Sequence, residues 1–403
     1  MLPLFIAENM NKELFILHLT LIDGIGPITI KKMWKKIPHD FDVSGLYRAR
    51  KSDIVQMFGF SEKLAAKLVN GLQDTEKLEK EVQLIGKHNI NFVTIASEAY
   101  PQLLSHIYAP PPVLYFIGEP ILGYEKNIAF VGSRKAHRYG EKVIERIVPD
   151  MVHRGFCIVS GGAIGADSMA HRATVRAKGK TIAIVGSGLL NPYPHSNKRL
   201  FNDIVKSGGA LVSPFPLETM AKPGNFPARN RIIAGLSVGC VVVQAAKKSG
   251  ASITAQFALD QGREVFAVPG SVDDQLSLGC HALIQQGAKL ISCADDILVE
   301  FGCVVQNDDV QSCQKEFVQG AISPQKLNID GVKQNLKISS KRSNCYEDGT
   351  VEHVIMECCK IPCSIDEISV VTDKEINELH EILFEMQLQG NIQQNHAGMF
   401  ERL

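Results

Sequence analysis

The fold is decided by residues 127–165, which read NIAFVGSRKAHRYGEKVIERIVPDMVHRGFCIVSGGAIG. Two short apolar runs, NIAFV and FCIV, enclose a longer stretch in which apolar residues recur at helical spacing. Continuous apolar runs rich in Val and Ile are typical of parallel strands that are buried on both faces. The stretch therefore predicts a β-α-β unit in which a glycine turn follows each strand.

The same alternation continues on both sides of this unit. Six further runs have the character of buried strands: VLYFIG (113–118), TIAIVG (181–186), ALVSPF (210–215), VGCVVVQ (238–244), EVFAVPG (264–270) and KLISC (289–293). Helical stretches separate several of them, for example at 165–179, 195–208 and 251–263. This order predicts an α/β fold with an open, doubly wound parallel sheet. Ligands of such sheets bind outside the carboxyl ends of the strands, where the glycine turns fall.

Pattern and composition divide the chain into four parts. Residues 1–78 contain short helical runs around DGIGP (23–27), a pattern typical of a helix-hairpin-helix, whose glycines let the backbone approach a phosphate; a plain packing unit is the alternative. The α/β region spans 79–300. A segment rich in Gln, Asn, Ser and Lys at 301–345 is expected to be a linker. Helical runs followed by a hairpin pattern at 346–403 indicate a winged-helix-like domain.

Composition excludes several classes of protein. The 403 residues are 45% hydrophobic and 21% charged, which is ordinary for a globular protein. No apolar stretch is long enough for a membrane span, and the N-terminus lacks the basic segment of a secretory signal. The ten cysteines follow no disulfide pattern, so we expect a cytoplasmic protein.

Charge is unevenly distributed although the formal net charge is zero. Residues 126–300 hold about 21 Lys and Arg against about 13 Asp and Glu, whereas residues 349–403 hold about 3 against about 10. A basic middle and an acidic tail indicate different partners, although ordinary solvated surfaces would give the same counts. Phosphates would repel the acidic tail, which favours a protein partner for it.

The most informative candidate site is PGNFPARNRIIAGLS, residues 223–237. Its glycine and prolines predict a loop that leads into an apolar segment. The loop carries the guanidinium groups of Arg229 and Arg231, which suit phosphate oxygens, with Asn230 between them. Phe226 just upstream offers an aromatic face on which a base can stack.

Two glycine-rich turns after strands are expected to extend this anion-binding surface, because glycine lets backbone amides approach a phosphate. The turns comprise Gly132, Ser133 and Arg134, and then Ser160, Gly161, Gly162 and Gly165. Neither turn has the spacing of a dinucleotide fingerprint or of an ATP-binding P-loop. No metal-ligand spacing, cofactor motif or catalytic set stands out, so the region has binding groups without evident reaction groups.

An ordered set of motifs resembles the DNA-processing protein A family, also called DprA or Smf. The motifs are GSR (132–134), SGGAIGAD (160–167), YP and N within 193–197, PGNFPARNRIIAGLS (223–237), SGASITA (249–255), VFAVPG (265–270) and LGCHALIQQGAKLI (278–291). Several motifs recur in the family's order over roughly residues 80–300, which makes the resemblance specific. It implies an extended Rossmann-like core, with a helical helix-hairpin-helix or SAM-like domain before it and a winged-helix domain after it.

The resemblance also implies a function. Members of the family bind single-stranded DNA in a positively charged pocket, form homodimers, and load the RecA recombinase onto incoming DNA during natural transformation. The resemblance therefore implies a binding protein without enzymatic activity, cofactor or metal. The family's pocket arginine matches Arg134, its pocket lysine and aromatic residue match Lys222 and Phe226, and the arginines of its RNRI motif match Arg229 and Arg231.

The family's dimer contact matches the apolar run around His281, Leu283 and Leu290. The chain departs from the family pattern at three positions. Gln244 replaces a usual glutamate, His281 a usual asparagine, and Ala251 a common serine. These departures put any family role of those three positions in doubt, but not the pocket.

Two functions of other classes remain open. One is a Rossmann-like enzyme that cleaves nucleotide glycosidic bonds, as the lysine-decarboxylase-like phosphoribohydrolases do. Those enzymes carry a PGGxGT turn followed by a glutamate, whereas Gly161 and Gly162 lead to Gly165 and Asp167 with no matching acid. The other is a nucleotide sensor that binds a small ligand and signals through the acidic tail.

Overall fold

The computed structural model describes residues 10–38, 40–119 and 123–302, and from the C-terminal part residues 350–360, 363, 365–372, 374, 378–379, 382–383, 386, 391–394 and 400–402. The chain separates into two compact units, Met1–Gly320 and Ala321–Leu403. The linker expected at 301–345 lies outside the described residues except for 301 and 302.

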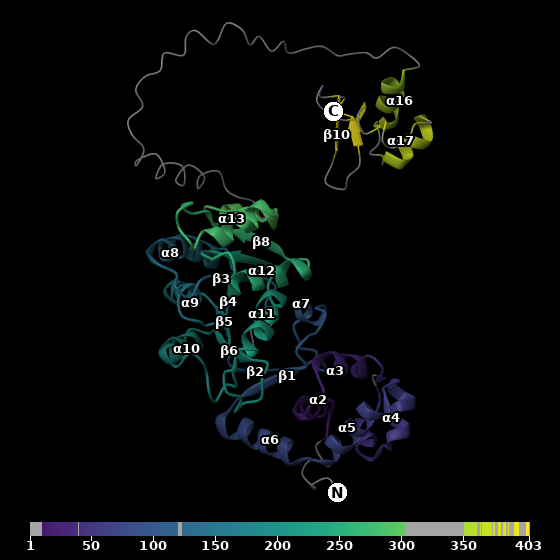
Figure 1. The fold of residues 1–403 in the computed structure, drawn as a ribbon, viewed down its shortest axis with the longest axis vertical. Helices are drawn as coiled ribbons and strands as arrows, with labels where there is room; N and C mark the ends of the chain where they lie inside the picture. Colours follow the sequence, from purple (N-terminus) through teal and green to yellow (C-terminus); the bar gives the residue numbers. More distant parts are fainter. Residues whose placement is uncertain are drawn as a thin grey trace. The chain divides into compact units, whose positions relative to one another are not determined.

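A nine-stranded sheet forms the centre of the first unit (Figure 1). Its strands are β1 (Asn91–Thr94), β2 (Val113–Gly118), β3 (Asn127–Val131), β4 (Cys157–Ser160), β5 (Thr181–Ile184), β6 (Ala210–Ser213), β7 (Gly239–Val242), β8 (Glu264–Ala267) and β9 (Lys289–Leu290). In space they follow the order β1-β2-β6-β5-β4-β3-β7-β8-β9. Every apolar run identified in the sequence forms a strand, which confirms the α/β prediction, and β1 is an addition to it.

The sheet is mixed, which corrects the expectation of a purely parallel one. Seven neighbouring strands run parallel, in the spatial order β6, β5, β4, β3, β7, β8 and β9. In contrast, β2 pairs antiparallel with both β6 and β1. The side chains of Val113, Leu114, Tyr115 and Phe116 on β2 are all buried. A strand buried on both faces has a continuous apolar sequence whichever way it runs, so the sequence pattern did not reveal its direction.

Helices cover both faces of the sheet (Figure 1). On one face lie α8 (Arg138–His153), α9 (Ala166–Arg176), α10 (Lys198–Lys206) and α14 (Asp295–Glu300), and on the other α7 (Gln102–Ser105), α11 (Asn225–Gly235), α12 (Gly250–Asp260) and α13 (Leu278–Gln285). Alternate residues of β3 supply the two cores, because successive side chains of a strand point to opposite faces. Ile128 and Phe130 pack with α8 and α9, while Ala129 and Val131 lie in the core that includes α11 and α12.

The strand order places a topological switch point between β3 and β7. From β3 the chain adds β4, β5 and β6 on one side, and then returns to add β7, β8 and β9 on the other. The connections therefore leave β3 and β7 in opposite directions. The result is a crevice outside the carboxyl ends of these two strands, which is where open α/β sheets bind their ligands.

The N-terminal helices pack against the β1–β2 edge of the sheet. They are α2 (Lys12–Leu21), α3 (Pro27–Trp34), the 3₁₀ helix η1 (Val43–Arg48), α4 (Lys51–Phe58), α5 (Glu62–Gln73) and α6 (Glu76–His88). Their apolar side chains share one hydrophobic core with Val113 and Tyr115 of β2. In addition, Glu81 of α6 accepts a hydrogen bond of 2.8 Å from the amide of Leu217. The boundary expected after residue 78, between the N-terminal domain and the α/β domain, falls inside α6. That boundary stays a prediction.

The C-terminal unit combines helices with a small antiparallel ribbon. It contains α16 (Val351–Cys358), α17 (Ile365–Thr372), β10 (Ile392–Gln394) and β11 (Phe400–Arg402), and β10 pairs with β11. Ile355, Ile368 and Phe400 are buried in its core. The third helical stretch expected at 375–389 lies largely outside the described residues, so the winged-helix assignment stays a prediction.

Two glycines test how tightly the loops around the sheet are packed. A Cβ at Gly188, which follows β5, would collide with the carbonyl oxygens of Pro216 and Leu217, whereas a Cβ at Gly86 in α6 would meet no atom within 4 Å. We expect Gly188→Ala to lower the free energy of unfolding by about 1–3 kcal/mol. Gly86→Ala, the control, should raise it by about 0.5–1 kcal/mol. Urea unfolding followed by circular dichroism measures both, and equal effects would contradict the packing.

Candidate nucleic-acid interface

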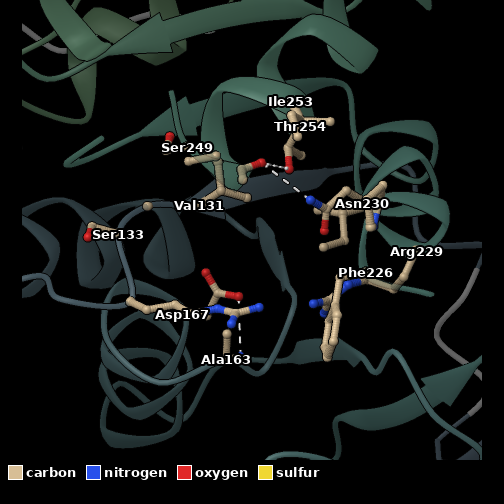
Figure 2. A pocket seen from close by; sticks show the side chains of 16 residues that line it. Val131, Ser133, Ala163, Asp167, Phe226, Arg229, Asn230, Ser249, Ile253 and Thr254 are labelled. Carbon is tan, nitrogen blue, oxygen red and sulfur yellow. Dashed lines mark hydrogen bonds between the residues drawn. The ribbon is translucent and has the colours of Figure 1, made fainter. Parts of the chain in front are cut away.

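A cavity of about 210 Å³ lies at the switch point between β3 and β7 (Figure 2). Its walls come from the turn after β3, the loop before α9, helix α11 and the beginning of α12. The side chains that matter for its chemistry are those of Arg134, Asp167, Phe226, Arg229, Asn230 and Ser249. The site expected from the sequence and the crevice expected from the topology therefore coincide.

Arg229 is a buried part of the scaffold rather than an exposed phosphate ligand. It is only 3% exposed, and its Nη1 donates to the carbonyl oxygens of Gly161 and Ile184. Burial lowers the pKa of Arg229 to about 10, so the group stays protonated at neutral pH. The buried carboxyl of Asp167 attracts this charge, although burial raises the pKa of Asp167 above its usual value. Arg229 is thus compensated inside the protein, which corrects the expectation of a free guanidinium.

The glycine-rich turns use their polar groups internally. The amide of Ser133 donates to the carbonyl of Gln244 at 2.6 Å, and the carbonyl of Ser133 accepts from the amide of Ala166 at 3.1 Å. Ser160 is fully buried, and its hydroxyl donates to the carbonyl of Phe130 at 2.6 Å. The Ser160 hydroxyl and the Ser133 amide are thus used inside the protein, whereas Ser133 itself lines the cavity, so its contact with an anion stays a prediction.

Close packing explains why this region contains so many glycines. A Cβ at Gly161 would collide with the guanidinium of Arg229, and a Cβ at Gly165 with the carbonyl of Ser133. Gly165 and Gly162 also adopt positive φ angles of 86° and 63°, which favour glycine. Gly162 is buried, so it supports the turn without facing the cavity. Asn197, from the YP..N motif, donates to the carbonyl of Gly162 at 2.9 Å and braces the turn further.

The segment expected to be a loop at 223–237 is helical from Asn225 onward, as α11. Pro227 lies in the first turn of the helix, where the missing N–H is not needed. Residues two apart on a helix point about 200° away from each other, so Arg229 and Arg231 face opposite sides. Arg231 lines a different cavity of about 570 Å³, together with Arg263. The structure therefore separates the two arginines, contrary to the expectation of one surface.

Arg134 and Phe226 form the accessible pair at the cavity. Arg134 is exposed, and its Cζ lies 5.2 Å from the centroid of the Phe226 ring, a cation–π distance. A second, small cavity of about 40 Å³ adjoins this pair and is also lined by Ile164 and Tyr193. Tyr193 is 41% exposed and meets Phe226 edge to face with centroids 5.9 Å apart. An accessible cation thus lies beside two aromatic rings.

The beginning of α12 adds a positive end to the cavity wall. Ser249 caps this helix by accepting from the amide of Ser252 at 3.2 Å, and both Ser249 and Gly250 line the cavity. Asn230 donates to the carbonyl of Gly250 at 3.3 Å, which fixes α12 to α11 (Figure 2). The N-terminus of a helix carries a partial positive charge that favours an anion. Lys222 is exposed, but it is not among the residues that line the described cavities.

The three residues expected at the dimer contact differ in accessibility. Leu283 is 7% exposed and packs inward with the core of α11 and α12, so it has little surface to offer a partner. His281 is partly buried, and its Nε2 lies 3.1 Å from the carbonyl oxygen of Gly270. Leu290, on the edge strand β9, is 49% exposed. Only Leu290 therefore has the exposed apolar surface that the expectation requires.

Sequence reasoning missed Tyr193, Ile164 and the structural role of Asp167. Tyr193 and Ile164 stand out as large apolar residues in polar turns, which is a usable signal, but turn chemistry explains Tyr193 equally well. Asp167 follows the glycine turn at the start of α9, where a helix-dipole role explained it equally well. Within the described part of the chain, no cluster of three or more potential metal ligands occurs, and no helix is long and apolar enough to cross a membrane.

Comparison with known proteins places this site in a family. A family model described as DNA recombination-mediator protein A matches residues 91–302, which is more than half of the chain. The chain belongs to this family. It is 31% identical to the protein Smf of Synechocystis over 97% of its own length and 99% of the relative's. It is 39% identical to the DNA processing protein DprA of Bacillus subtilis, over 68% of this chain and 91% of that one.

A solved structure supports the fold of the family core. The X-ray structure of DNA processing protein A from Streptococcus pneumoniae matches with a TM-score of 0.63 at 35% identity, over 72% of this chain and 98% of that chain. The α/β core described above is thus the fold of a DprA family member, and the family resemblance expected from the motifs is confirmed. Several relatives in this family are named DNA processing proteins.

Arg229 and Arg134 give opposite expectations for stability. We expect Arg229→Gln to lower the free energy of unfolding by about 3–5 kcal/mol, because it leaves Asp167 as an uncompensated buried charge. The matched control Arg134→Gln removes an exposed guanidinium and should change stability by less than about 0.5 kcal/mol. Urea unfolding of the three proteins distinguishes the roles. A stable Arg229→Gln variant would show that Arg229 is not the buried support inferred from its contacts.

Proposed function

We propose that this protein binds single-stranded DNA in the cleft between β3 and β7, where Arg134 meets phosphates and Phe226 meets a base. The observation that carries the proposal is the 5.2 Å pairing of an exposed guanidinium with an accessible aromatic ring at the switch point. Single-strand-binding proteins use the same combination of backbone cations and stacking rings. Membership in a DNA-processing family supports the choice of DNA as the ligand.

The shape of the site favours an unpaired strand. A ring such as Phe226 can stack only on a base whose face is free, and a duplex hides its base faces within the helix. The cavity is about 210 Å³, far smaller than a double helix, and its wall offers isolated side chains rather than an element that could enter a groove. Little sequence specificity is expected, because stacking and phosphate contacts are available to every nucleotide.

The electrostatics of the cavity favour binding over chemistry. Asp167 is the one carboxylate among the described residues that line the two adjoining cavities, and it is buried beside Arg229. Its Oδ2 also accepts from the amide of Ala163 at 3.3 Å. A carboxylate held in this way is poorly placed to activate water. This geometry supports a DNA-binding role rather than the alternative role of a phosphoribohydrolase.

Exposed side chains at the site should control DNA affinity. We expect Arg134→Ala to weaken binding of oligothymidylate and to reduce the slope of log K against log salt by about 0.7, the value for one single-strand phosphate contact. Phe226→Leu should cost about 1–3 kcal/mol of binding with no change in that slope, because it removes a stacking surface and no charge. Fluorescence anisotropy titrations at several salt concentrations measure both quantities.

Lys178→Gln is the matched charge control, since Lys178 is exposed and follows α9 at the amino-end edge of the sheet. Unchanged affinity and slope in Arg134→Ala would contradict the proposed interface. Release of free base from deoxynucleoside monophosphates by the unmodified protein would instead favour the enzymatic alternative. Competition of a mononucleotide with the oligonucleotide at equal concentrations would favour the nucleotide sensor.

The family resemblance supports two finer proposals, a homodimer and loading of RecA onto the bound strand. Leu290 is the expected dimer residue with exposed apolar surface. We expect Leu290→Glu to shift the protein from dimer to monomer in analytical ultracentrifugation and to slow RecA filament formation on DNA coated with single-strand-binding protein. Val371→Glu, a charge placed on an exposed residue of the C-terminal unit, is the control for the dimer. A dimer that withstands Leu290→Glu would place the interface elsewhere.

A further inference from the structure

A second groove lies on the same unit of the chain as the cleft. It has a volume of about 550 Å³ and runs along α10. Its floor is apolar, with side chains such as Leu189, Phe201 and Val205. Its polar lining is basic or neutral: His88, Asn191, His195, Lys198, Asn202 and Lys206. No carboxylate occurs among the described residues that line it.

The groove and the cleft are joined through one short segment of chain. Tyr193 and Pro194 line the small cavity beside Phe226, while Pro192 and His195 line the groove. Three aromatic rings contact one another in sequence between the small cavity and the groove. Phe226 and Tyr193 have centroids 5.9 Å apart, and Tyr193 and His195 have centroids 6.0 Å apart, both edge to face. Tyr193 therefore lies between the small cavity, which it lines, and His195, which lines the groove.

One face of α10 forms a wall of the groove and carries two lysines. Lys198, Phe201, Asn202, Val205 and Lys206 recur at helical intervals, so one face of α10 forms the wall. Lys198 and Lys206 are both exposed and lie eight residues apart, or about 12 Å along the helix. Neither lysine occurs in the ion pairs that the described residues form. Lys198 also opens α10, where the partial positive charge of the helix end adds to its own.

We propose that the groove along α10 holds the continuation of the bound single strand, with Tyr193 as a second stacking surface and with Lys198 and Lys206 as contacts to two backbone phosphates of that strand. This inference rests on the proposed function, because the strand must first occupy the cleft. The apolar floor suits base faces and the basic rim suits a polyanion, which is the pattern of a single-strand track. The strand then binds over two adjoining segments, and its site is longer than the cleft alone.

Oligonucleotides of two lengths test the path. Oligothymidylates of about 4 and about 16 nucleotides are titrated into the full-length protein at several salt concentrations. The double variant Lys198→Gln/Lys206→Gln should bind the long oligonucleotide about tenfold more weakly, with a salt slope reduced by about 1.4, twice the value for one contact. Binding of the short one should not change. The control Lys126→Gln/Lys178→Gln removes the same charge from exposed positions at the amino-end edge of the sheet and should leave both affinities unchanged.

Tyr193 is tested separately from charge. Tyr193→Ala should weaken binding of the long oligonucleotide about tenfold with an unchanged salt slope, and Tyr193→Phe should restore it, since stacking needs only the ring. The inference is overturned if the lysine pair affects both lengths equally, or no more than its control. A protein whose DNA binding depends on Arg134 and Phe226 but not on Lys198, Lys206 or Tyr193 would retain the proposed function and lose only the groove. A protein that binds neither oligonucleotide would refute both.

Discussion

The site depends on a single buried charge. Arg229 is buried near the carboxyl ends of the strands. Burying an isolated ion without partners is unfavourable by several kcal/mol. The structure offsets this cost with Asp167 and with the carbonyl groups of Gly161 and Ile184. These partners belong to the loop before α9, the start of α9 and the end of β5. One guanidinium therefore ties α11 to three other parts of the fold.

The packing and hydrogen bonds around Arg229 limit which groups of the site can contact a ligand. The glycine turns are already committed to packing around Arg229 and to hydrogen bonds such as that of the Ser133 amide to Gln244. The groups committed in this way are not free to form a phosphate-binding nest like that of a P-loop. In the proposed interface, recognition therefore relies on side chains that project from the rigid frame, chiefly Arg134 and Phe226. A site of this kind suits a flexible polymer, because each contact is independent of sequence and each is replaceable along the strand.

The sequence predicted the strands of the sheet better than it predicted which charged residues are buried and which can contact a ligand. Runs such as NIAFV and TIAIV predict strands because both faces are buried, and that burial leaves no trace of strand direction, so the antiparallel β2 was missed. The segment at 223–237 contains Gly and Pro, which favour a loop, but Pro227 falls in the first helical turn, where it is tolerated. Once that segment is a helix, the spacing of Arg229 and Arg231 places them on opposite sides. Burial of a charged residue depends on tertiary neighbours such as Asp167, which local sequence does not specify.

The binding free energies of the individual contacts indicate that the cleft alone binds a strand too weakly. One stacked base contributes about 1–3 kcal/mol, and one exposed ion contact typically contributes less than that. Their sum is at most about the 4.1 kcal/mol that corresponds to a millimolar dissociation constant, so a single cleft would hold a strand only weakly. A useful affinity needs more contacts on the same strand, from the groove along α10 or from a second copy of the chain. Joining weak sites on one polymer can raise affinity by about 10²–10⁴ without any stronger contact, because the second binding step is intramolecular. A strand that spans several weak clefts can also be released from them one at a time, which is compatible with the proposed transfer of the strand to RecA.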